Sequence, residues 1–490
     1  MSIVRKELLK LSTLIVLTLQ LNISVAFNSF RLLPAGTKTA NLQNKPSATL
    51  HRPFLFDIRD FGAVPDTVTV NTKAIQSAID KCNVNGGGVV LIAGGPYVTG
   101  TIYLKSNVCL RIESGATLLG SKNIKDYATN TDRTMYRGEP YMNRCLIFAN
   151  AASNITIEGR GVIDGQGRSF PNRGDSVRNR PKMIRLMNCN NFRLRDITLR
   201  APAAWTTEFR YCNDIAVDGI TIYSRANSNG DGLDFDGCTK VRVSNSTFDT
   251  SDDAICLQTS LTEYPCRDIT INNCHFTSRW AGVRIGLLSR GDFENITISN
   301  CSFRDHNDSG LKIQMCEGAE MKNMVFSNLV MKNVPRPVFF TFTQQNAWVD
   351  APPDSFPPMK RVHNILFSNI TVDNTGGNKH SAFIITGMPG HPIEHISFSD
   401  IRAIVSGGGT KSDAENVLAE LDVENIKARW PEYGGLRGTV PAHGLYVRHV
   451  KGITVRNMEF FTKVADARPA IVFVDVKEAK VSDAPPPDNR

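Results

Sequence analysis

The stretch Asp214-Ile215-Ala216-Val217-Asp218-Gly219-Ile220 decides the fold of this chain. Apolar and polar residues alternate along it with a period of two, which is the pattern of a half-buried β-strand. The motif recurs with its first apolar residue at positions 192, 215, 241, 269, 296 and 324. The gaps of 23, 26, 28, 27 and 28 residues are typical of a solenoid, in which each copy forms one coil.

The coils must stack, because one short strand cannot bury its apolar side chains alone. We therefore predict an all-β fold, a single-stranded right-handed parallel β-helix, whose hand follows the general rule for parallel crossovers. Later copies are spaced more widely, which predicts insertions at Val334–Lys360 and Ser406–His443. Thr72–Cys82 carries apolar residues at helical spacing, and we expect it to form a short N-terminal helix that caps the first coil.

The two ends of the chain differ from the repeats. Residues 1–26 combine basic residues, an apolar stretch and the small residues Ser24-Val25-Ala26, which is the pattern of a cleaved secretory signal peptide. The apolar stretch is short for a membrane span. We expect a secreted or periplasmic protein with a signal peptide at 1–26, a leader at 27–53, the β-helix at 54–480 and a disordered tail at 481–490.

Charge and cysteine content restrict the possible partners. The 490 residues carry a formal net charge of +9, and a basic secreted protein is steered toward polyanions. Nucleic acid belongs to the wrong compartment and no motif for it is present, so an acidic polysaccharide is the expected partner, bound by a monomer without a membrane span. Several of the 11 cysteines occupy equivalent places in successive copies, which indicates small residues stacked inside the coils rather than a disulfide framework.

Carboxylates gather at one-coil spacing in Asn229-Gly230-Asp231-Gly232 and Ser251-Asp252-Asp253. Residues one coil apart lie about 4.8 Å apart along a stack of strands, so these three aspartates should crowd one patch. Crowded carboxylates push their pKa values apart, which suits a site that needs one carboxylic acid and one carboxylate base. The simpler explanation is that aspartates fill turns between strands.

The order of four segments resembles glycoside hydrolase family 28, the polygalacturonase family of pectin-degrading enzymes: Asn229-Gly230-Asp231, Asp252-Asp253, Gly282-Val283-Arg284-Ile285-Gly286 and Gly310-Leu311-Lys312-Ile313-Gln314. The resemblance covers residues 54–460. It implies that Asp252 is the general acid and that Asp231 and Asp253 hold and deprotonate the attacking water. It also implies that galacturonosyl linkages are cleaved with inversion, and that no metal or organic cofactor takes part.

Two departures from the family concern the substrate. Members usually have Gly-His-Gly where this chain has Trp280-Ala281-Gly282, and Arg-Ile-Lys where it has Lys312-Ile313-Gln314. In polygalacturonases that Arg and Lys hold the galacturonate carboxylate beside the scissile bond, whereas Lys offers one point charge and Gln offers none. The resemblance therefore points to members that place a neutral rhamnose there. The residues expected to contact substrate are Asn229, Arg284, Lys312, Gln314, His306 and Trp280.

Two other functions remain open. A Ca²⁺-dependent pectate lyase shares the β-helix, and an acidic cluster would bind that ion. A non-catalytic carbohydrate-binding β-helix would explain the missing His and the altered Arg-Ile-Lys segment. The order of the motifs favours hydrolysis, and the retention of all three aspartates argues against a binding protein.

Overall fold

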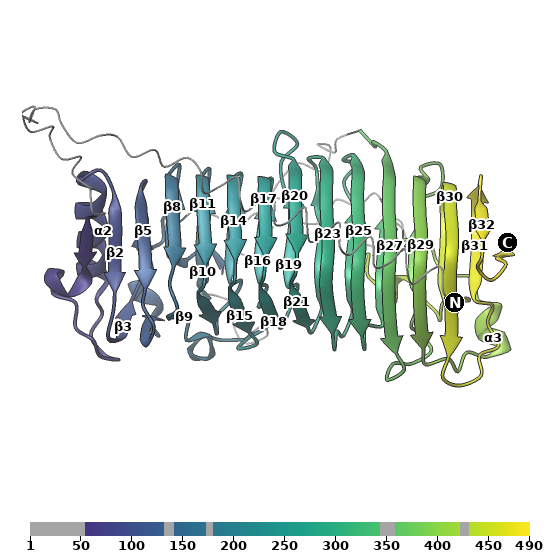
Figure 1. Ribbon diagram of the computed structural model, residues 1–490, viewed down its shortest axis with the longest axis horizontal. Helices are drawn as coiled ribbons and strands as arrows, with labels where there is room; N and C mark the ends of the chain where they lie inside the picture. The colour runs from purple at the N-terminus through teal and green to yellow at the C-terminus, as the bar shows by residue number, and fades with distance from the viewer. Residues whose placement is uncertain (1–53, 132–141, 173–179, 344–357, 422–430) are drawn as a thin grey trace, which may run out of the picture. The chain divides into compact units, whose positions relative to one another are not determined.

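The computed structural model describes residues 54–131, 142–172, 180–343, 358–421 and 431–490; the expected signal peptide and leader lie outside them. These residues form one right-handed parallel β-helix, as predicted, in which each strand pairs in parallel with strands of the coils before and after it (Figure 1). Among the described residues, no helix has the length and apolar character needed to cross a membrane.

The strands make three faces. Face 1 contains β4 (Ile102–Tyr103), β7 (Cys145–Asn150), β10 (Lys182–Met187), β13 (Thr207–Arg210), β16 (Leu233–Asp236), β19 (Ile255–Thr259), β22 (Ala281–Ser289), β24 (Ser309–Met315), β26 (Arg336–Phe342), β28 (Phe383–Thr386), β31 (Ile471–Lys477) and β33 (Asp488–Asn489). Face 2 contains β1 (Leu55–Asp57), β2 (Gly88–Ile92), β5 (Val108–Ile112), β8 (Ser153–Glu158), β11 (Asn190–Arg195), β14 (Asn213–Asp218), β17 (Thr239–Ser244), β20 (Cys266–Asn272) and β32 (Lys480–Ser482). Face 3 contains β3 (Gly95–Thr99), β6 (Ala116–Gly120), β9 (Val162–Asp164), β12 (Thr198–Arg200), β15 (Thr221–Ser224), β18 (Thr247–Thr250) and β21 (His275–Ser278).

In the later coils the strands are longer and bend from one face to the next. Faces 2 and 3 share β23 (Phe293–Arg304), β25 (Met321–Lys332), β27 (Val362–Asn374) and β29 (Ile393–Val405), while β30 (Leu445–Thr462) contributes to all three faces. The short helices are η1 (Ile58–Phe61), η2 (Ile124–Asp126), η4 (Gly167–Ser169), α3 (Lys411–Ala414) and η5 (Tyr433–Leu436).

The capping helix is α2 (Thr72–Val84), slightly longer than predicted, and it lies at the N-terminal end of the β-helix (Figure 1). Ile75, Ala78, Ile79 and Cys82 lie on one side of it and are fully buried in the same core as the first coils. In the middle of the stack, each coil covers the apolar side chains of its neighbour. At this end no neighbouring coil among the described residues covers them, and the helix does so instead.

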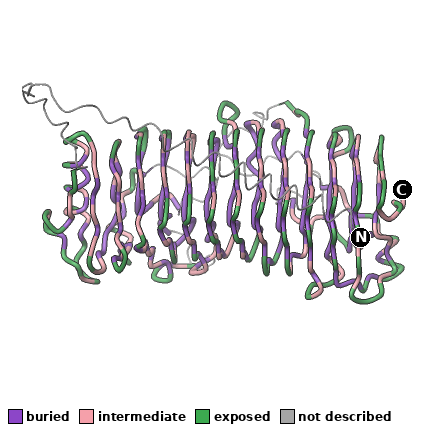
Figure 2. The backbone as a smooth tube through the Cα atoms, in the orientation of Figure 1, coloured by how far each residue is buried: buried purple, intermediate pink, exposed green. Residues whose placement is uncertain are grey.

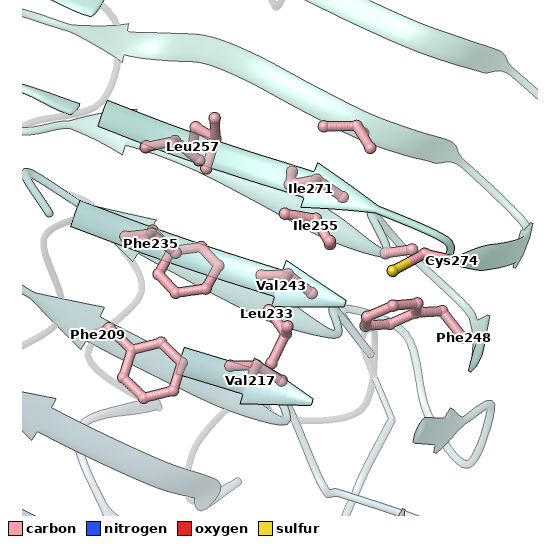
Figure 3. Close-up of a cluster of buried hydrophobic side chains, with 14 of the residues drawn as sticks. Phe209, Val217, Leu233, Phe235, Val243, Phe248, Ile255, Leu257, Ile271 and Cys274 are labelled. Carbon is pink, nitrogen blue, oxygen red and sulfur yellow. The ribbon is translucent and has the colours of Figure 1, made fainter. Parts of the chain in front are cut away.

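Inside the coils, equivalent residues of successive strands stack on one another. The register places Phe209 opposite Phe235, and their rings stack with centroids 5.1 Å apart (Figure 3). Buried positions alternate with partly exposed ones along strands of face 2, which is what the period-two pattern predicts, whereas strands of face 1 such as β10 and β24 are buried throughout. Figure 2 shows buried and exposed segments along the backbone. All 11 cysteines are unpaired thiols, and all except Cys109 are buried, as small interior residues should be.

Asparagines mark the corners of the coils. Asn154, Asn295 and Asn369 have φ angles of 57°, 57° and 50°, a left-handed conformation that Asn tolerates better than most residues. Their side chains hydrogen-bond to the equivalent corner of a neighbouring coil; for example, the amide of Asn369 donates to Asn328 at 2.8 Å. Turn geometry therefore explains these residues.

The C-terminal tail differs from the expected disorder. It contains β32 and β33, which pair in parallel with β30 and β31. The backbone N–H of Arg490 also donates to the carbonyl of Phe473 at 2.8 Å. The exposed edge of the last coil offers unpaired backbone groups, and the tail satisfies them although its composition is polar and rich in proline.

Candidate active site

The outer side of face 1 carries a row of buried polar side chains. The strand register aligns Arg185 with Glu208, Asp234 with Cys256, Cys256 with Arg284 and Arg284 with Lys312. Buried charges need partners, and Glu208 has two, because it pairs with Arg185 and lies 3.0 Å from the Nζ atom of Lys182. The predicted aspartates lie next to this row, and Asp253 contacts one of its members, Arg284.

The three predicted aspartates come together at one edge of face 1. Asp231 lies in the turn between β15 and β16, and Asp252 and Asp253 lie in the turn between β18 and β19 one coil later. The two turns are in contact, since the N–H of Gly232 donates to the carbonyl of Asp253 at 3.0 Å. One carboxylate oxygen from each aspartate lies within 4.8 Å of the other two, which confirms the expected crowding.

The three carboxylates differ in their access to solvent. Asp231 is 6% exposed and Asp253 is 1% exposed, whereas Asp252 is half-buried. The Oδ1 atom of Asp231 is buried and has no hydrogen-bond partner among the described residues. Asp252 is therefore the carboxylate that a large molecule on the surface can reach, and Asp231 presents an unsatisfied oxygen within the cluster.

Burial and mutual repulsion hold a proton in this cluster. Burial raises the pKa of Asp231 well above its usual range, and the neighbouring Asp252 raises it further. Burial also raises the pKa of Asp252. For Asp253, burial raises the pKa to about 7 although the guanidinium of Arg284 opposes the shift. The raised pKa values favour a protonated carboxyl group in the cluster, while Arg284 favours the ionised form of Asp253, and an acid–base pair requires both forms.

Two cations predicted to bind substrate lie next to the aspartates. The Nη1 atom of Arg284 lies 2.9 Å from Oδ2 of Asp253, and its Nη2 atom lies 3.1 Å from Oε1 of Glu432. One coil further, the Nζ atom of Lys312 contacts Glu432 and lies 2.8 Å from Oδ2 of Asp308. Both cations are thus engaged by carboxylates of the chain itself.

Trp280 and Asn229 also lie near these groups. The indole of Trp280 is one-third exposed, and the Nζ atom of Lys312 lies 4.5 Å from the ring centroid. This geometry leaves part of the ring available for stacking on a sugar. Asn229 accepts a hydrogen bond of 2.8 Å from Nη2 of Arg180, which holds the turn that carries Asp231.

His306 is buried inside the β-helix, where its ring packs against Phe303. It is 4% exposed, and its ring nitrogens lie 3.1 and 3.2 Å from the carbonyl oxygens of Ser309 and Phe276. Burial lowers its pKa to about 4, so the ring is neutral. This placement does not support the expected contact with substrate, and His306 has no part in the proposal below.

The predicted insertion Ser406–His443 covers face 1 beyond Lys312. Its described part packs apolar side chains onto outward-facing residues of β26, β28, β30 and β31; the cluster comprises Phe339, Ala382, Ile384, Leu418, Leu421, Leu436, Val440, Ala442, Tyr446 and Val472. Gln314 lies under this insertion, fully buried, and its amide donates to the carbonyl of Pro431 at 3.0 Å. The next residue, Glu432, reaches Arg284 and Lys312.

Three charged residues at the site, Glu432, Asp308 and Arg336, were not among those predicted from the sequence. The Nη2 atom of Arg336 lies 2.6 Å from Oδ1 of Asp308, which completes the set of ion pairs around Lys312. Asp308 and Arg336 each lie close to a repeat and would have been found by aligning the coils. Nothing in the sequence signals Glu432, because an insertion has no repeat that predicts where its residues lie.

Comparisons with known proteins identify the family of the chain. The family model described as glycosyl hydrolases family 28 matches residues 91–423. The chain is 26% identical over 451 residues to an exo-poly-alpha-D-galacturonosidase of Dickeya chrysanthemi (80% of this chain, 73% of the relative). It is also 26% identical over 364 residues to a probable polygalacturonase of Vitis vinifera (70% and 72%).

Solved structures show the same fold. The family 28 exopolygalacturonase of Yersinia enterocolitica aligns with a TM-score of 0.68 and 23% identity, covering 89% of this chain and 79% of that one. The exopolygalacturonase of Thermotoga maritima aligns with a TM-score of 0.59 and 20% identity, covering 72% and 87%.

Proposed function

Because the chain belongs to glycosyl hydrolases family 28 and is a pectin-type glycoside hydrolase, we propose that it is secreted and cleaves α-galacturonosyl-type linkages with Asp231, Asp252 and Asp253. The observation that carries the assignment of residues is the juxtaposition of three carboxylates within 4.8 Å beside the guanidinium of Arg284. A site of this kind can hold a proton and a negative charge at once.

Asp252 is the general acid in this proposal. It is the one of the three carboxylates that is half-buried rather than buried, and its pKa is raised by burial, so it can bring a proton to a glycosidic oxygen on the surface. Protonation lets the leaving sugar depart as a neutral alcohol while positive charge develops on the other sugar ring.

Asp253 and Asp231 act on the water. The ion pair with Arg284 favours the ionised form of Asp253, which can then take a proton from the attacking water. Asp231, with its unpaired oxygen and raised pKa, holds that water by a hydrogen bond. The proton that Asp252 gives up is thereby replaced by one from water, and the cluster returns to its starting charge.

Inversion at the anomeric carbon is proposed from the family resemblance and not from the distance between the carboxyl groups. Inverting pairs are usually separated by roughly 6.5–9.5 Å, whereas the closest oxygens here lie within 4.8 Å. Proton NMR of the first product decides between the two outcomes. A β-anomer released from an α-linkage indicates inversion, and an α-anomer indicates a covalent intermediate on one of the aspartates.

The Ca²⁺-dependent lyase is the alternative that the acidic cluster itself suggests. Its oxygens are close enough for one cation to contact all three. The guanidinium of Arg284, however, lies 2.9 Å from Asp253 and repels a second cation at that carboxylate. Hydrolysis, by contrast, uses the pairing of Asp253 with Arg284 directly.

A non-catalytic binding protein is disfavoured as well, because burying three neighbouring carboxyl groups destabilises the fold and is not needed to bind a polysaccharide.

The substrate is proposed to be of the rhamnogalacturonan type, since Lys312 and Gln314 replace the residues that hold a uronate in polygalacturonases. The test incubates purified protein with polygalacturonan and with rhamnogalacturonan, with and without a chelator. New reducing ends and ultraviolet absorbance are followed together. Chelator-resistant reducing ends without absorbance support hydrolysis, whereas absorbance that vanishes with chelator identifies a lyase.

A further inference from the structure

We propose that Glu432 is a specificity-determining residue, whose carboxylate occupies the cationic site beside the aspartates so that the sugar bound there must be uncharged. The inference rests on the proposed hydrolase function and adds the residue that sets the charge of the accepted sugar.

The contacts of Glu432 are those that a uronate would make. One carboxylate oxygen lies 3.1 Å from Arg284 and the other contacts Lys312, so a single carboxylate bridges cations of two adjacent coils. Only 22% of the side chain is exposed. Charge-assisted hydrogen bonds of this kind are strong, and a sugar carboxylate would need the same donors.

The charges around this site already balance. Three cations face three carboxylates, and the pairs are Arg284 with Asp253 and Glu432, Lys312 with Asp308 and Glu432, and Arg336 with Asp308. The cations hold the pKa of Asp308 far below its usual range, so that carboxylate stays ionised. A uronate would bring a fourth negative charge into a poorly solvated place, whereas the hydroxyl groups of a neutral sugar would not.

The segment that carries Glu432 is anchored on both sides. The carbonyl of Pro431 accepts the hydrogen bond from Gln314, and the ring of Tyr433 lies 4.7 Å from the guanidinium of Arg336. The hydroxyl of Tyr433 also lies 3.0 Å from Nδ1 of His380, and Leu436 is fully buried. A buried amide at position 314 can donate to a carbonyl without adding charge, which explains a Gln at this position.

The decisive experiment compares leaving sugars that differ in charge alone. Wild type and Glu432→Gln are assayed on digalacturonate and on the same disaccharide with a methyl ester on its reducing-end carboxyl. Wild type should have a higher kcat/KM for the ester than for the free acid. In Glu432→Gln the ratio of kcat/KM for the free acid to that for the ester should rise at least about tenfold, because a hydrogen bond to a charged group contributes a free energy that corresponds to such a factor. Glu432→Ala should change the ratio in the same direction.

The matched control is Glu420→Gln. Glu420 lies on the same insertion and pairs with Arg448 at 3.1 Å, away from the aspartates, so its substitution should leave the ratio unchanged. An unchanged ratio in both Glu432 variants, or a wild-type preference for the free acid, overturns the inference. Hydrolysis of an aryl galacturonide by wild type tests the catalytic proposal separately, because that substrate has no leaving sugar. Failure on every galacturonoside overturns the proposed function, and the inference with it.

Discussion

The guanidinium of Arg284 lies 2.9 Å from the carboxylate of Asp253, one coil away, and joins the acidic cluster to the ion pairs of the next coils. This contact gives one carboxylate of the cluster a positive neighbour at close range, which favours its ionised form. Which aspartate acts as the base in the proposed mechanism therefore depends on Arg284, a residue of the following coil.

Replacing Arg284 should shift the pH dependence of catalysis. Arg284→Gln removes the charge that opposes the upward pKa shift of Asp253, so this pKa should rise above about 7. The acidic limb of the kcat/KM profile, which reports the group that must be ionised, should move to higher pH. Arg284→Lys keeps the charge and should move the limb less. An acidic limb that stays in place in Arg284→Gln would exclude Asp253 as the base.

Loss of the general acid should abolish most of the activity. Asp252→Asn keeps the shape of the side chain but cannot give up a proton, and kcat should fall by roughly 10²- to 10⁴-fold. The thermal unfolding midpoint should not fall, because the substitution removes a carboxyl that burial disfavours in its charged form. Asp249→Asn is the matched control, since Asp249 lies on the preceding strand β18 and pairs with Arg225. Wild-type turnover in Asp252→Asn would contradict the assignment.

A chelator should leave the reaction unaffected. The protonated acid and the carboxylate base supply the chemistry in the proposed mechanism, so dialysis against EDTA should not change the rate of reducing-end formation. The assay is repeated with added Ca²⁺, and the absorbance of an unsaturated product is followed alongside. A rate that collapses on dialysis and returns with Ca²⁺ would favour elimination.

Asp234 should lower the stability of the fold at neutral pH. It is 1% exposed, both of its carboxylate oxygens lack a hydrogen-bond partner among the described residues, and burial raises its pKa well above its usual range. As pH rises past about 3.9, the unfolded chain loses the proton of this carboxyl group and the folded state keeps it. The free energy of unfolding therefore falls by about 1.4 kcal/mol for each pH unit, until the folded-state pKa is reached.

Asp234→Asn should thus raise the thermal unfolding midpoint, and the gain should be larger at pH 7 than at pH 4. Asp214→Asn is the control of opposite sign, because Arg242 and Arg193 lower the pKa of Asp214, and its ion pairs add stability above its usual pKa. Equal midpoints for Asp234→Asn and wild type at both pH values would refute this account of Asp234.

The sequence repeat alone predicts much of the candidate site. The repeat aligns Asp231 with Asp252 and Asp253 on neighbouring coils, and it places Arg284 and Lys312 on the next two, because residues one repeat apart in a solenoid lie side by side. The repeat gave no guide to His306, whose ring nitrogens lie beside the carbonyl oxygens of Ser309 and, one coil earlier, of Phe276.

The sequence by itself determined the β-helix, its capping helix and the cluster of aspartates, since each depends on a pattern that repeats locally or on a register one coil long. Only the tertiary structure decided what faces Arg284 and Lys312. Glu432 reaches them because Leu436 and its neighbours in the insertion pack against Tyr446 and other outward-facing residues of face 1. Such contacts join parts of the chain that share no repeat, and they form only when apolar surfaces of the finished solenoid are available to bury.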